Sequence, residues 1–493
     1  MILKFAQMAS HKDRRAYPHH AQRSPLQNSG RLSMWTPWSS WMKDYGFYQA
    51  IQIACLVLLF GNASAIAQQT LSLDMATVAG LARDRSWSSK QAHQEAAAAV
   101  AVAQQASSMR WGRVDFQSQY LRLNDPIEIK SPIPASLASV LGISALTTPV
   151  APVDNLHVAL EGRIPLFTGG KITNAIREAK AGSKAVANAA TDTDNAVVFA
   201  AEKSYLSVLL AQEVVELNEK ALRSYNEHRV QAEAAFRQGT AAKYDVIRAE
   251  AAVADQDKKL IEARNQLDLS VAALRTSLSL EDNESIQVHG NLVEIHDDVN
   301  RTQMIDSATQ TSALLKALEE KISASHSNLR VQQGNYLPQV TGVAEREMVD
   351  SKLAQTDPTW AVGGRVTLQL FDGGERRAKV SQARAQLKSS EYEYHHVKEQ
   401  LQLAVRSACL DFESGKSELI SARKSSELAA ESLRLATKRF EVGTGTSLEV
   451  LDANVSLTAA EIGIQRSLFD IDLAYLQMHR YAGDIAEVAA RIQ

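Results

Sequence analysis

The chain has few of the residues on which compact or cross-linked domains depend. Only two of its 493 residues are cysteines, Cys55 and Cys409, and only 6% are aromatic. We expect Cys55 to be removed with an export signal, which leaves one thiol and excludes an internal disulfide or a metal site built on paired cysteines. Glycine and proline are also sparse. A composition rich in Ala, Leu, Glu, Lys, Gln and Ser favours long helices over a compact mixed core.

Several classes of function lack their sequence signals. The net charge is −3 and no basic patch argues for nucleic acid as a partner. Gly170 and Lys171 lack the upstream glycine and the following Ser or Thr of a phosphate-binding loop. No nucleophile motif or dinucleotide fingerprint is present, and the adjacent His395 and His396 would point to different sides of a helix. The sequence therefore predicts a protein that is not an enzyme and needs no cofactor or metal.

The N-terminal residues are typical of an export signal. Residues 1–48 are basic, and residues 51–60 form an apolar run of about ten residues. Such a run is too short to span a bilayer and suits the apolar region of a signal peptide. Small-residue cleavage patterns follow, so we predict a signal peptide with a basic extension over 1–67. A buried hydrophobic helix is the alternative, and Met34 or Met42 is an alternative start.

Two short motifs occur twice in the chain, at the same offset. Residues 166–170 (LFTGG) return as 370–374 (LFDGG), and residues 236–240 (FRQGT) return as 440–444 (FEVGT). The segment between the motifs therefore has the same length in both copies. A repeat of this size is far longer than a solenoid unit and marks a duplicated half-molecule.

Each predicted repeat contains long helices. Six segments lack internal proline and carry loosely spaced apolar residues: 72–110, 171–237, 244–280, 301–335, 374–439 and 446–482. We expect them to pack as in coiled coils, and the longest would extend roughly 100 Å at 1.5 Å per residue. We assign the first repeat to 68–280, an equatorial segment to 281–300 and the second repeat to 301–493.

Alternation of apolar and polar residues precedes each Gly-Gly pair. One apolar set is Leu156, Val158, Leu160 and Ile164, and its counterpart is Trp360, Val362, Val366 and Leu368. The intervening positions include His157, Glu161, Arg163 and Arg365. A strand of about ten residues with one apolar face suits a membrane β-barrel, with lipid outside and water inside. A soluble sheet covered by helices is the alternative.

Partner strands at 113–123 and 338–347 would complete two β-hairpins, 113–166 and 338–371. Four strands cannot close a barrel, and open sheet edges are not tolerated in hydrocarbon. Lipid-facing strands therefore require an oligomer, although this argument does not fix the number of chains. The first hairpin loop, 124–155, is the longer one. It would lie over the barrel mouth or against lipid, or be an ordinary variable surface loop.

The order of these segments resembles the TolC family of outer-membrane efflux channels. Residues 442–454 (VGTGTSLEVLDAN) resemble that family's second periplasmic tip, and 239–246 are the first-half counterpart. The resemblance covers about residues 70–483. It implies a homotrimer with a shared twelve-stranded outer-membrane barrel, continued by a helical barrel across the periplasm. It also implies docking of a periplasmic adaptor protein and an inner-membrane pump of ABC, RND or MFS type at the tips.

Glycines mark the predicted turns. Gly169, Gly170, Gly373 and Gly374 would turn each strand into a helix, and Gly239 and Gly443 would end the long helices in the left-handed conformation. We expect the hydroxyls of Thr240 and Thr444 to cap the returning helices. The resemblance assigns adaptor docking to the tips, which comprise Gly239, Thr240, Val442, Gly443, Thr444 and Gly445. A turn without a contact role is the alternative.

Acidic residues follow the second tip. Glu449 and Asp452 are three apart and share a helix face, so a trimer would place six carboxylates at the pore mouth, where they favour cations. Favourable charge in the first helical turn is the alternative, as it is for Asp245. The family's channels have a basic residue where this chain has Gly445. Arg248 occupies the position 204 residues before Asp452, and we expect it to supply a replacement ion pair between neighbouring helices.

Two other architectures are compatible with parts of the sequence. A periplasmic adaptor would have one helical hairpin and no lipid-facing strands, and a structural coiled-coil protein would need neither strands nor glycine tips. The transported substrate is not readable from the residues.

Overall fold

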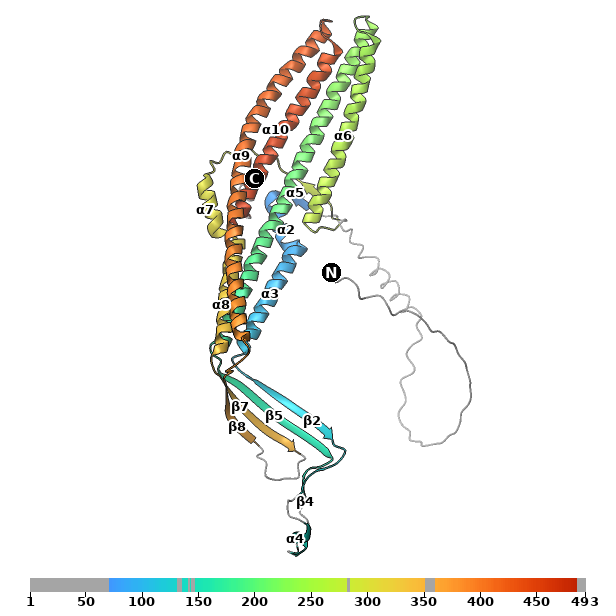
Figure 1. Ribbon diagram of the computed structural model, residues 1–493. Coiled ribbons are helices and arrows are strands. Elements are labelled where there is room, and N and C mark those ends of the chain that lie inside the picture. The colour runs from blue at the N-terminus through green and yellow to red at the C-terminus, as the bar shows by residue number, and fades with distance from the viewer. Residues whose placement is uncertain are drawn as a thin grey trace, which may run out of the picture. The chain divides into compact units, whose positions relative to one another are not determined.

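The computed structural model describes residues 71–130, 135–140, 142, 147–281, 284–350 and 360–485. The chain divides into two units, Met1–Ala67 and Gln68–Gln493. The predicted signal peptide lies outside the described residues, as do parts of both hairpin loops. The description below concerns the second unit (Figure 1).

Four long helices form two antiparallel pairs. Their bounds lie close to the predicted ones: α5 Lys171–Arg237, α6 Lys243–Ser277, α9 Glu375–Glu441 and α10 Ser447–Ala482. Helices α5 and α9 each have 67 residues. Helix α6 packs along α5 and α10 along α9, and both tips lie at the same end (Figure 1). No helix in the described part of the chain is both long and apolar enough to cross a bilayer.

The helices predicted over 72–110 and 301–335 are each broken in two, so these predictions were wrong in detail. The pieces are α2 Met75–Arg85, α3 Trp87–Ser108, α7 Arg301–Thr311 and α8 Ala313–Gln333, followed by the 3₁₀ turn η1 Gly334–Tyr336. The breaks fall at Ser86 and Ser312, whose ψ angles are 130° and 120°. Each serine Oγ accepts a backbone N–H of the following helix. A one-residue break leaves the apolar pattern almost unchanged, so only the local dihedrals reveal it.

A small parallel sheet connects the first repeat to the segment predicted to link the repeats. Strand β1, Leu71–Leu73, pairs with β6, Ile286–Val288. The start of the first repeat is thereby hydrogen-bonded to the linking segment. The long hairpin loop contains a second small sheet, β3 Ile127–Lys130 with β4 Thr147–Ala151, and the short helix α4 Ala135–Val140.

The main sheet has four antiparallel strands in the order β2-β5-β7-β8. They are β2 Arg113–Arg122, β5 Asp154–Phe167, β7 Gln339–Asp350 and β8 Trp360–Thr367. The two hairpins join through the β5–β7 pair, so one strand of each repeat contributes to the junction. Strands β2 and β8 are the two edges.

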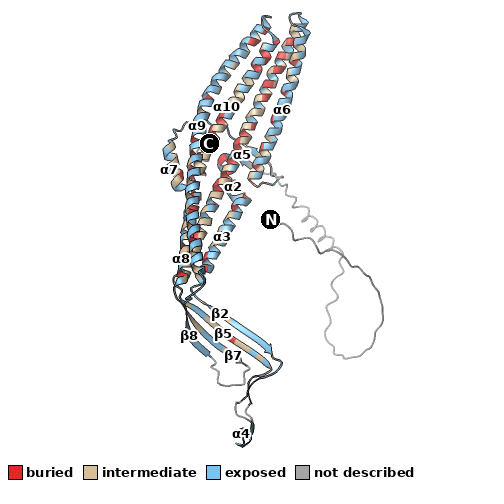
Figure 2. Cartoon of the chain, viewed as in Figure 1, coloured by how far each residue is buried: buried red, intermediate tan, exposed pale blue. Residues whose placement is uncertain are grey.

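The largest core lies among the helices and not in the sheet. Phe412, Leu206, Ile471, Leu476 and Met478 are all almost completely buried in one cluster. In Figure 2, buried residues gather where α2, α5, α9 and α10 meet, while the strands are mostly exposed or intermediate. The helical region therefore has the protomer's own core, and the sheet contributes little to it.

Replacing Phe412 by alanine tests this core. Its ring is 2% exposed and lies 6.0 Å from that of Tyr475. Loss of a buried phenylalanine costs about 3–5 kcal/mol. We expect thermal denaturation of the detergent-solubilised protein, followed by helical circular dichroism, to shift down by several degrees. The control is Leu410→Ala on the same helix, whose side chain is 46% exposed. Equal shifts in both variants would contradict this assignment of the core.

Candidate functional site

One face of the four-stranded sheet is apolar. Residues directly opposite one another in neighbouring strands share a face, and the register places Gly162, Ala344 and Val362 in one row. The next row contains Leu160, Arg346 and Trp360, so Arg346 is a charged residue on this otherwise mostly apolar face. By this register and the alternation along each strand, the following predicted residues share the face: Leu156, Val158, Leu160, Ile164, Trp360, Val362 and Val366. Leu368 lies beyond the end of β8.

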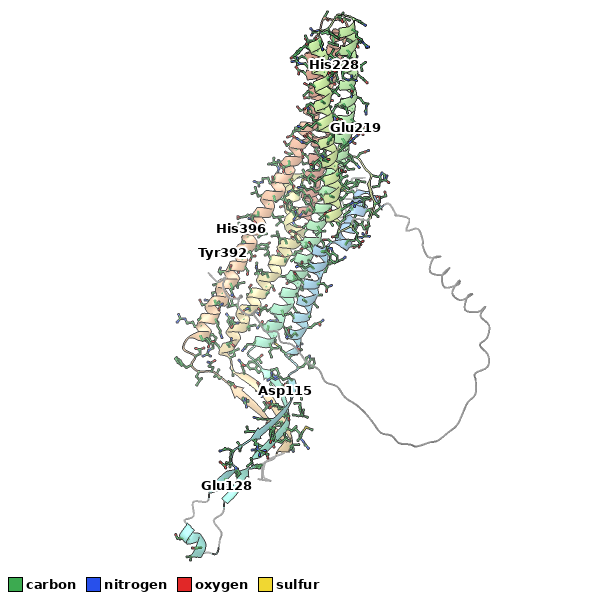
Figure 3. The ribbon with its side chains drawn as sticks, turned by 90° about the vertical axis from the view of Figure 1, so that its right-hand side faces the viewer. Asp115, Glu128, Glu219, His228, Tyr392 and His396 are labelled. Carbon is green, nitrogen blue, oxygen red and sulfur yellow. The ribbon has the colours of Figure 1, made fainter. Side chains whose placement is uncertain are left out.

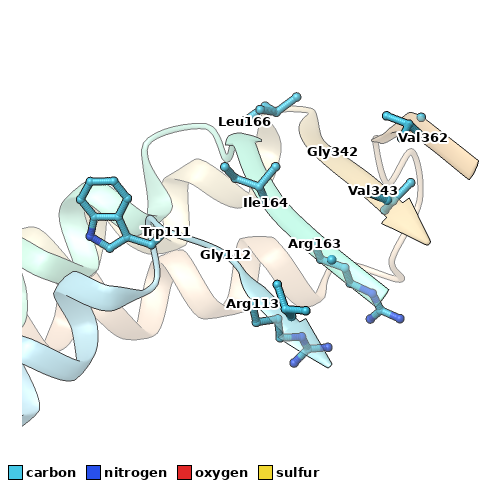
Figure 4. A pocket seen from close by; sticks show the side chains of 13 residues that line it. Trp111, Gly112, Arg113, Arg163, Ile164, Leu166, Gly342, Val343 and Val362 are labelled. Atoms are coloured by element: carbon cyan, nitrogen blue, oxygen red, sulfur yellow. The ribbon is translucent and has the colours of Figure 1, made fainter. Parts of the chain in front are cut away.

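The opposite face is polar and its charges are largely paired. Arg113 lies 3.0 Å from Asp115, and Arg163 donates to Glu161 at 2.7 Å. Figure 4 shows the side chains of Arg113 and Arg163 pointing away from Ile164 and Leu166. The sheet thus has one face suited to hydrocarbon and one suited to water.

Glycines deepen the apolar face near the helical end of the sheet. A depression of about 540 Å³ is lined by Gly162, Gly342, Ile164, Leu166 and Val362, with Trp111 at its edge (Figure 4).

Exposed aromatic residues lie at both ends of the strands. Trp111 and Phe371 lie near the helices, and Tyr120 and Trp360 lie near the hairpin loops; all four are exposed. Aromatic residues at both ends of an apolar band are typical of the two interfaces of a membrane.

Left-handed glycines join the sheet to the long helices. The φ angles are 61° and 80° at Gly169 and Gly170, and 64° and 92° at Gly373 and Gly374. In the second turn Asp372 accepts the backbone N–H groups of Gly374 and Arg376 at 3.0 and 3.1 Å. Hydrogen bonding from the Arg376 side chain, chiefly, lowers the pKa of Asp372, so this carboxylate is held in its charged form at the turn.

The tip glycines also have positive φ angles, 76° at Gly239 and 73° at Gly443. The expected capping by Thr240 and Thr444 was wrong. Their hydroxyls instead donate to carbonyls of the helices that have just ended, Ala235 O and Arg439 O. The chain needs two more residues to turn after each threonine, so the N-caps are Ala242 and Thr446.

Two of the three predicted gate carboxylates have partners close in sequence. Asp245 accepts the N–H of Ala242 at 3.2 Å, which supports its role in the first turn of α6. Glu449 forms an ion pair with Arg439 at 3.2 Å. Asp452 is exposed, as are Leu448 and Val455 on the same helix.

Within the described part of one protomer, Arg248 forms no ion pair with a neighbouring helix, so the predicted pair stays a prediction for the assembled protein. Its guanidinium donates to the Tyr244 hydroxyl at 3.0 Å, because Tyr244 lies one turn earlier on the same helix. Arg439 is the basic residue that forms an ion pair with Glu449, one of the two acidic residues. Arg439 precedes the tip glycine, whereas the resemblance indicates a basic residue after it.

A row of polar contacts joins α5 to α10 behind the tips. His228 is 2% exposed, its Nε2 lies 2.8 Å from Ser447 Oγ, and its ring meets that of Phe440 edge-on. Farther along, Ser224 donates to Asn454 and Lys220 to Glu461, both at 2.6 Å. Figure 3 shows His228 near the tip end of the helices. The sequence carried no signal for this row, which depends on the rotation of each helix.

Comparisons with known proteins agree with this architecture. The sequence profile named "Outer membrane efflux protein" matches residues 78–279 and 304–483. Outer membrane efflux protein BepC of Brucella suis is 23% identical over 321 residues, 63% of this chain and 68% of that protein. Alkaline protease secretion protein AprF of Pseudomonas aeruginosa is 23% identical over 58% of this chain and 61% of its own length.

The fold has a close counterpart among solved structures. The CmeC outer membrane channel of Campylobacter jejuni superposes with a TM-score of 0.70 at 17% identity, over 83% of this chain and 85% of that one. The resemblance noted from the tip residues is thereby confirmed. The chain belongs to the outer membrane efflux protein family.

Proposed function

We propose that three copies of this chain form one exit duct through the outer membrane, which a periplasmic adaptor and an inner-membrane pump open from the periplasmic side. The observation that carries the proposal is the main sheet, with one apolar face, one polar face and two open edges. Backbone groups at open edges in hydrocarbon need partners. Pairing β8 of one chain with β2 of the next supplies them, and three chains give a closed barrel of twelve strands.

The two repeats, 68–280 and 301–493, then line one tube. The family profile matches the chain in two separate stretches, which supports this division. Each long helix of 67 residues extends roughly 100 Å from the sheet, a length suited to a periplasmic barrel. The equatorial segment 281–300 joins the repeats. A periplasmic adaptor, the other candidate, would not need two hairpins combined in one sheet.

Neighbouring positions on β8 test the membrane-facing surface. Val362 lies on the apolar face and Ala361 on the polar one, and both are exposed. A lysine facing lipid costs about 2–4 kcal/mol at the bilayer midplane, whereas a residue facing the lumen tolerates charge. We expect Val362→Lys to reduce the amount of detergent-extracted trimer in outer membranes several-fold and Ala361→Lys to leave it near wild type. The reverse order, or a wild-type chain that is monomeric and soluble without detergent, would contradict the proposal.

The tips would be the site where the adaptor docks and the periplasmic gate opens. Gly239, Gly443 and Gly445 leave the turns small, and Thr240, Val442 and Thr444 are exposed beside them. In the trimer, Glu449 and Asp452 from three chains would surround the pore mouth, and Arg248 would be placed to meet Asp452 of a neighbouring chain.

Removal of the carboxylates tests the gate. Rings of carboxylates favour cations, so we expect the double variant Glu449→Gln, Asp452→Asn to lose cation preference in planar bilayers. The measurement is the reversal potential under a KCl gradient. The matched control is Glu427→Gln, an exposed glutamate on α9 farther from the tip. Unchanged selectivity in the double variant would exclude these residues from the constriction.

The burial of His228 predicts that acid weakens the contact between α5 and α10 at the closed tip. Burial lowers the pKa of His228 below its ordinary value of 6.5, against a smaller opposing effect of Asp245. When α5 and α10 separate, the His228 imidazole reaches water and takes up a proton below about pH 6.5, whereas in the packed state burial keeps it neutral. The contact between α5 and α10 therefore loses stability as pH falls. We expect open probability in bilayers to rise between pH 7.5 and 5.5.

The control for this prediction keeps the carboxylates and removes the imidazole. In His228→Leu the rise with acid should disappear, while His326→Ala, an exposed histidine on α8, should behave as wild type. An equal acid response in His228→Leu would assign the effect to the gate carboxylates.

A further inference from the structure

The polar face of the sheet carries a group of metal-ligating side chains. His157 of β5 and Glu345 and Glu347 of β7 each offer one ligand atom, and these atoms lie within 4.8 Å of one another. His157 Nδ1 lies 3.9 Å from Glu347 Oε1. We had expected no metal site from the sequence, because these ligands come from different repeats and meet only through the strand register.

The register explains why the three side chains meet. Ala159 pairs with Glu347 and Glu161 with Glu345, and the register then shifts, so that Val158 pairs with Val349. Met348 is thus the extra residue of a β-bulge beside the group. Bulges increase the local twist and re-aim side chains, which places His157 diagonally next to Glu347.

The carboxylates of this group differ from the neighbouring ones in their lack of ion-pair partners. Asp115 is paired with Arg113, and Glu161 with Arg163. Within the described part of the chain, no lysine or arginine forms an ion pair with Glu345 or Glu347. The side chains of His157 and Glu347 are only 33% and 22% exposed. Glu345 is exposed. Among the described residues, the two carboxylates and the imidazole therefore have no strong cationic partner, and two of the three groups are partly shielded from water.

We propose that His157, Glu345 and Glu347 form a binding site for a divalent first-row transition cation such as Zn²⁺. Imidazole nitrogen combined with carboxylate oxygen suits such ions. Bonds of about 2.0–2.2 Å place ligand atoms roughly 3–4 Å apart, so small rotations of the side-chain ends suffice. Ca²⁺ takes 6–8 oxygen ligands and fits this donor set poorly. Water molecules complete the coordination.

The bound ion would join β5 to β7, the junction between the two repeats. A ligand that binds only the folded state stabilises it in proportion to the logarithm of its concentration over Kd. The site itself needs only one protomer's sheet. Its position in the lumen, three times around the barrel, rests on the proposed channel, where it would remove negative charge from the water-filled face.

Calorimetric titration of the untagged, detergent-solubilised protein with ZnCl₂, after removal of metals with EDTA, tests the site. We expect about one ion per chain, and at least tenfold weaker binding in His157→Ala and in Glu347→Gln. Zn²⁺ should also raise the melting temperature of the wild type but not of these variants. The control His326→Ala should match wild type in both measurements.

Two results would overturn the site: a wild type that binds no Zn²⁺, and a His157→Ala variant that binds as tightly as wild type. A milder variant, His157→Asn, and the trimer size of each protein distinguish lost ligation from lost folding. Conductance of the metal-free wild type separates this proposal from the channel itself. A trimer that conducts without binding Zn²⁺ rejects the site alone.

Discussion

The rest of the structure depends on one constraint, that backbone N–H and C=O groups in hydrocarbon must be hydrogen-bonded. One protomer satisfies it within the sheet but leaves β2 and β8 open. The chain belongs to a family of outer-membrane exit ducts. The sheet of one protomer alone is not closed. In the proposed barrel the small core of the sheet has a simple explanation, because the apolar face would contact lipid and the polar face would contact water. Folding of the protomer must therefore rely on the helices.

The helical core allows one protomer to fold without a large core in its sheet. Phe412, Ile471 and Met478 are almost fully buried where the short helices wrap the long ones. The parallel pair of β1 with β6 and the hydrogen bond from Tyr205 to His289 O hold the linking segment there. The left-handed glycines then connect this rigid region to the sheet within two residues. Sheet and helices are thus joined by short turns and share little core.

The strands and the tips were predictable from the sequence because they follow a short period or a repeated motif. Alternation predicted the strands and the faces of Leu160 and Val362, and the two FxxGT motifs predicted the tips. The helix breaks at Ser86 and Ser312 were missed because one extended residue barely disturbs a helical pattern. Contacts such as Arg439 with Glu449, His228 with Ser447 and His157 with Glu347 depend on helix rotation or strand register across the repeats, and neither is encoded in local spacing.

The packing also determines which part of the protomer separates at the lowest cost in free energy. Near the tips, one buried cluster consists largely of alanine, namely Ala232, Ala249, Ala436 and Ala453, whereas the equatorial core contains Leu, Ile, Met and Phe. Apolar stabilisation scales with the area buried, about 25 cal/mol per Å², so separating alanine-lined helices costs less per turn. Exposed ion pairs such as Arg439 with Glu449 add only about 0–1 kcal/mol. A partner shifts such an equilibrium only by its difference in affinity for the two states. In the proposed gate, a weakly packed tip keeps the required difference in affinity small, and the strong equatorial core would confine the movement to the tip end of the helices.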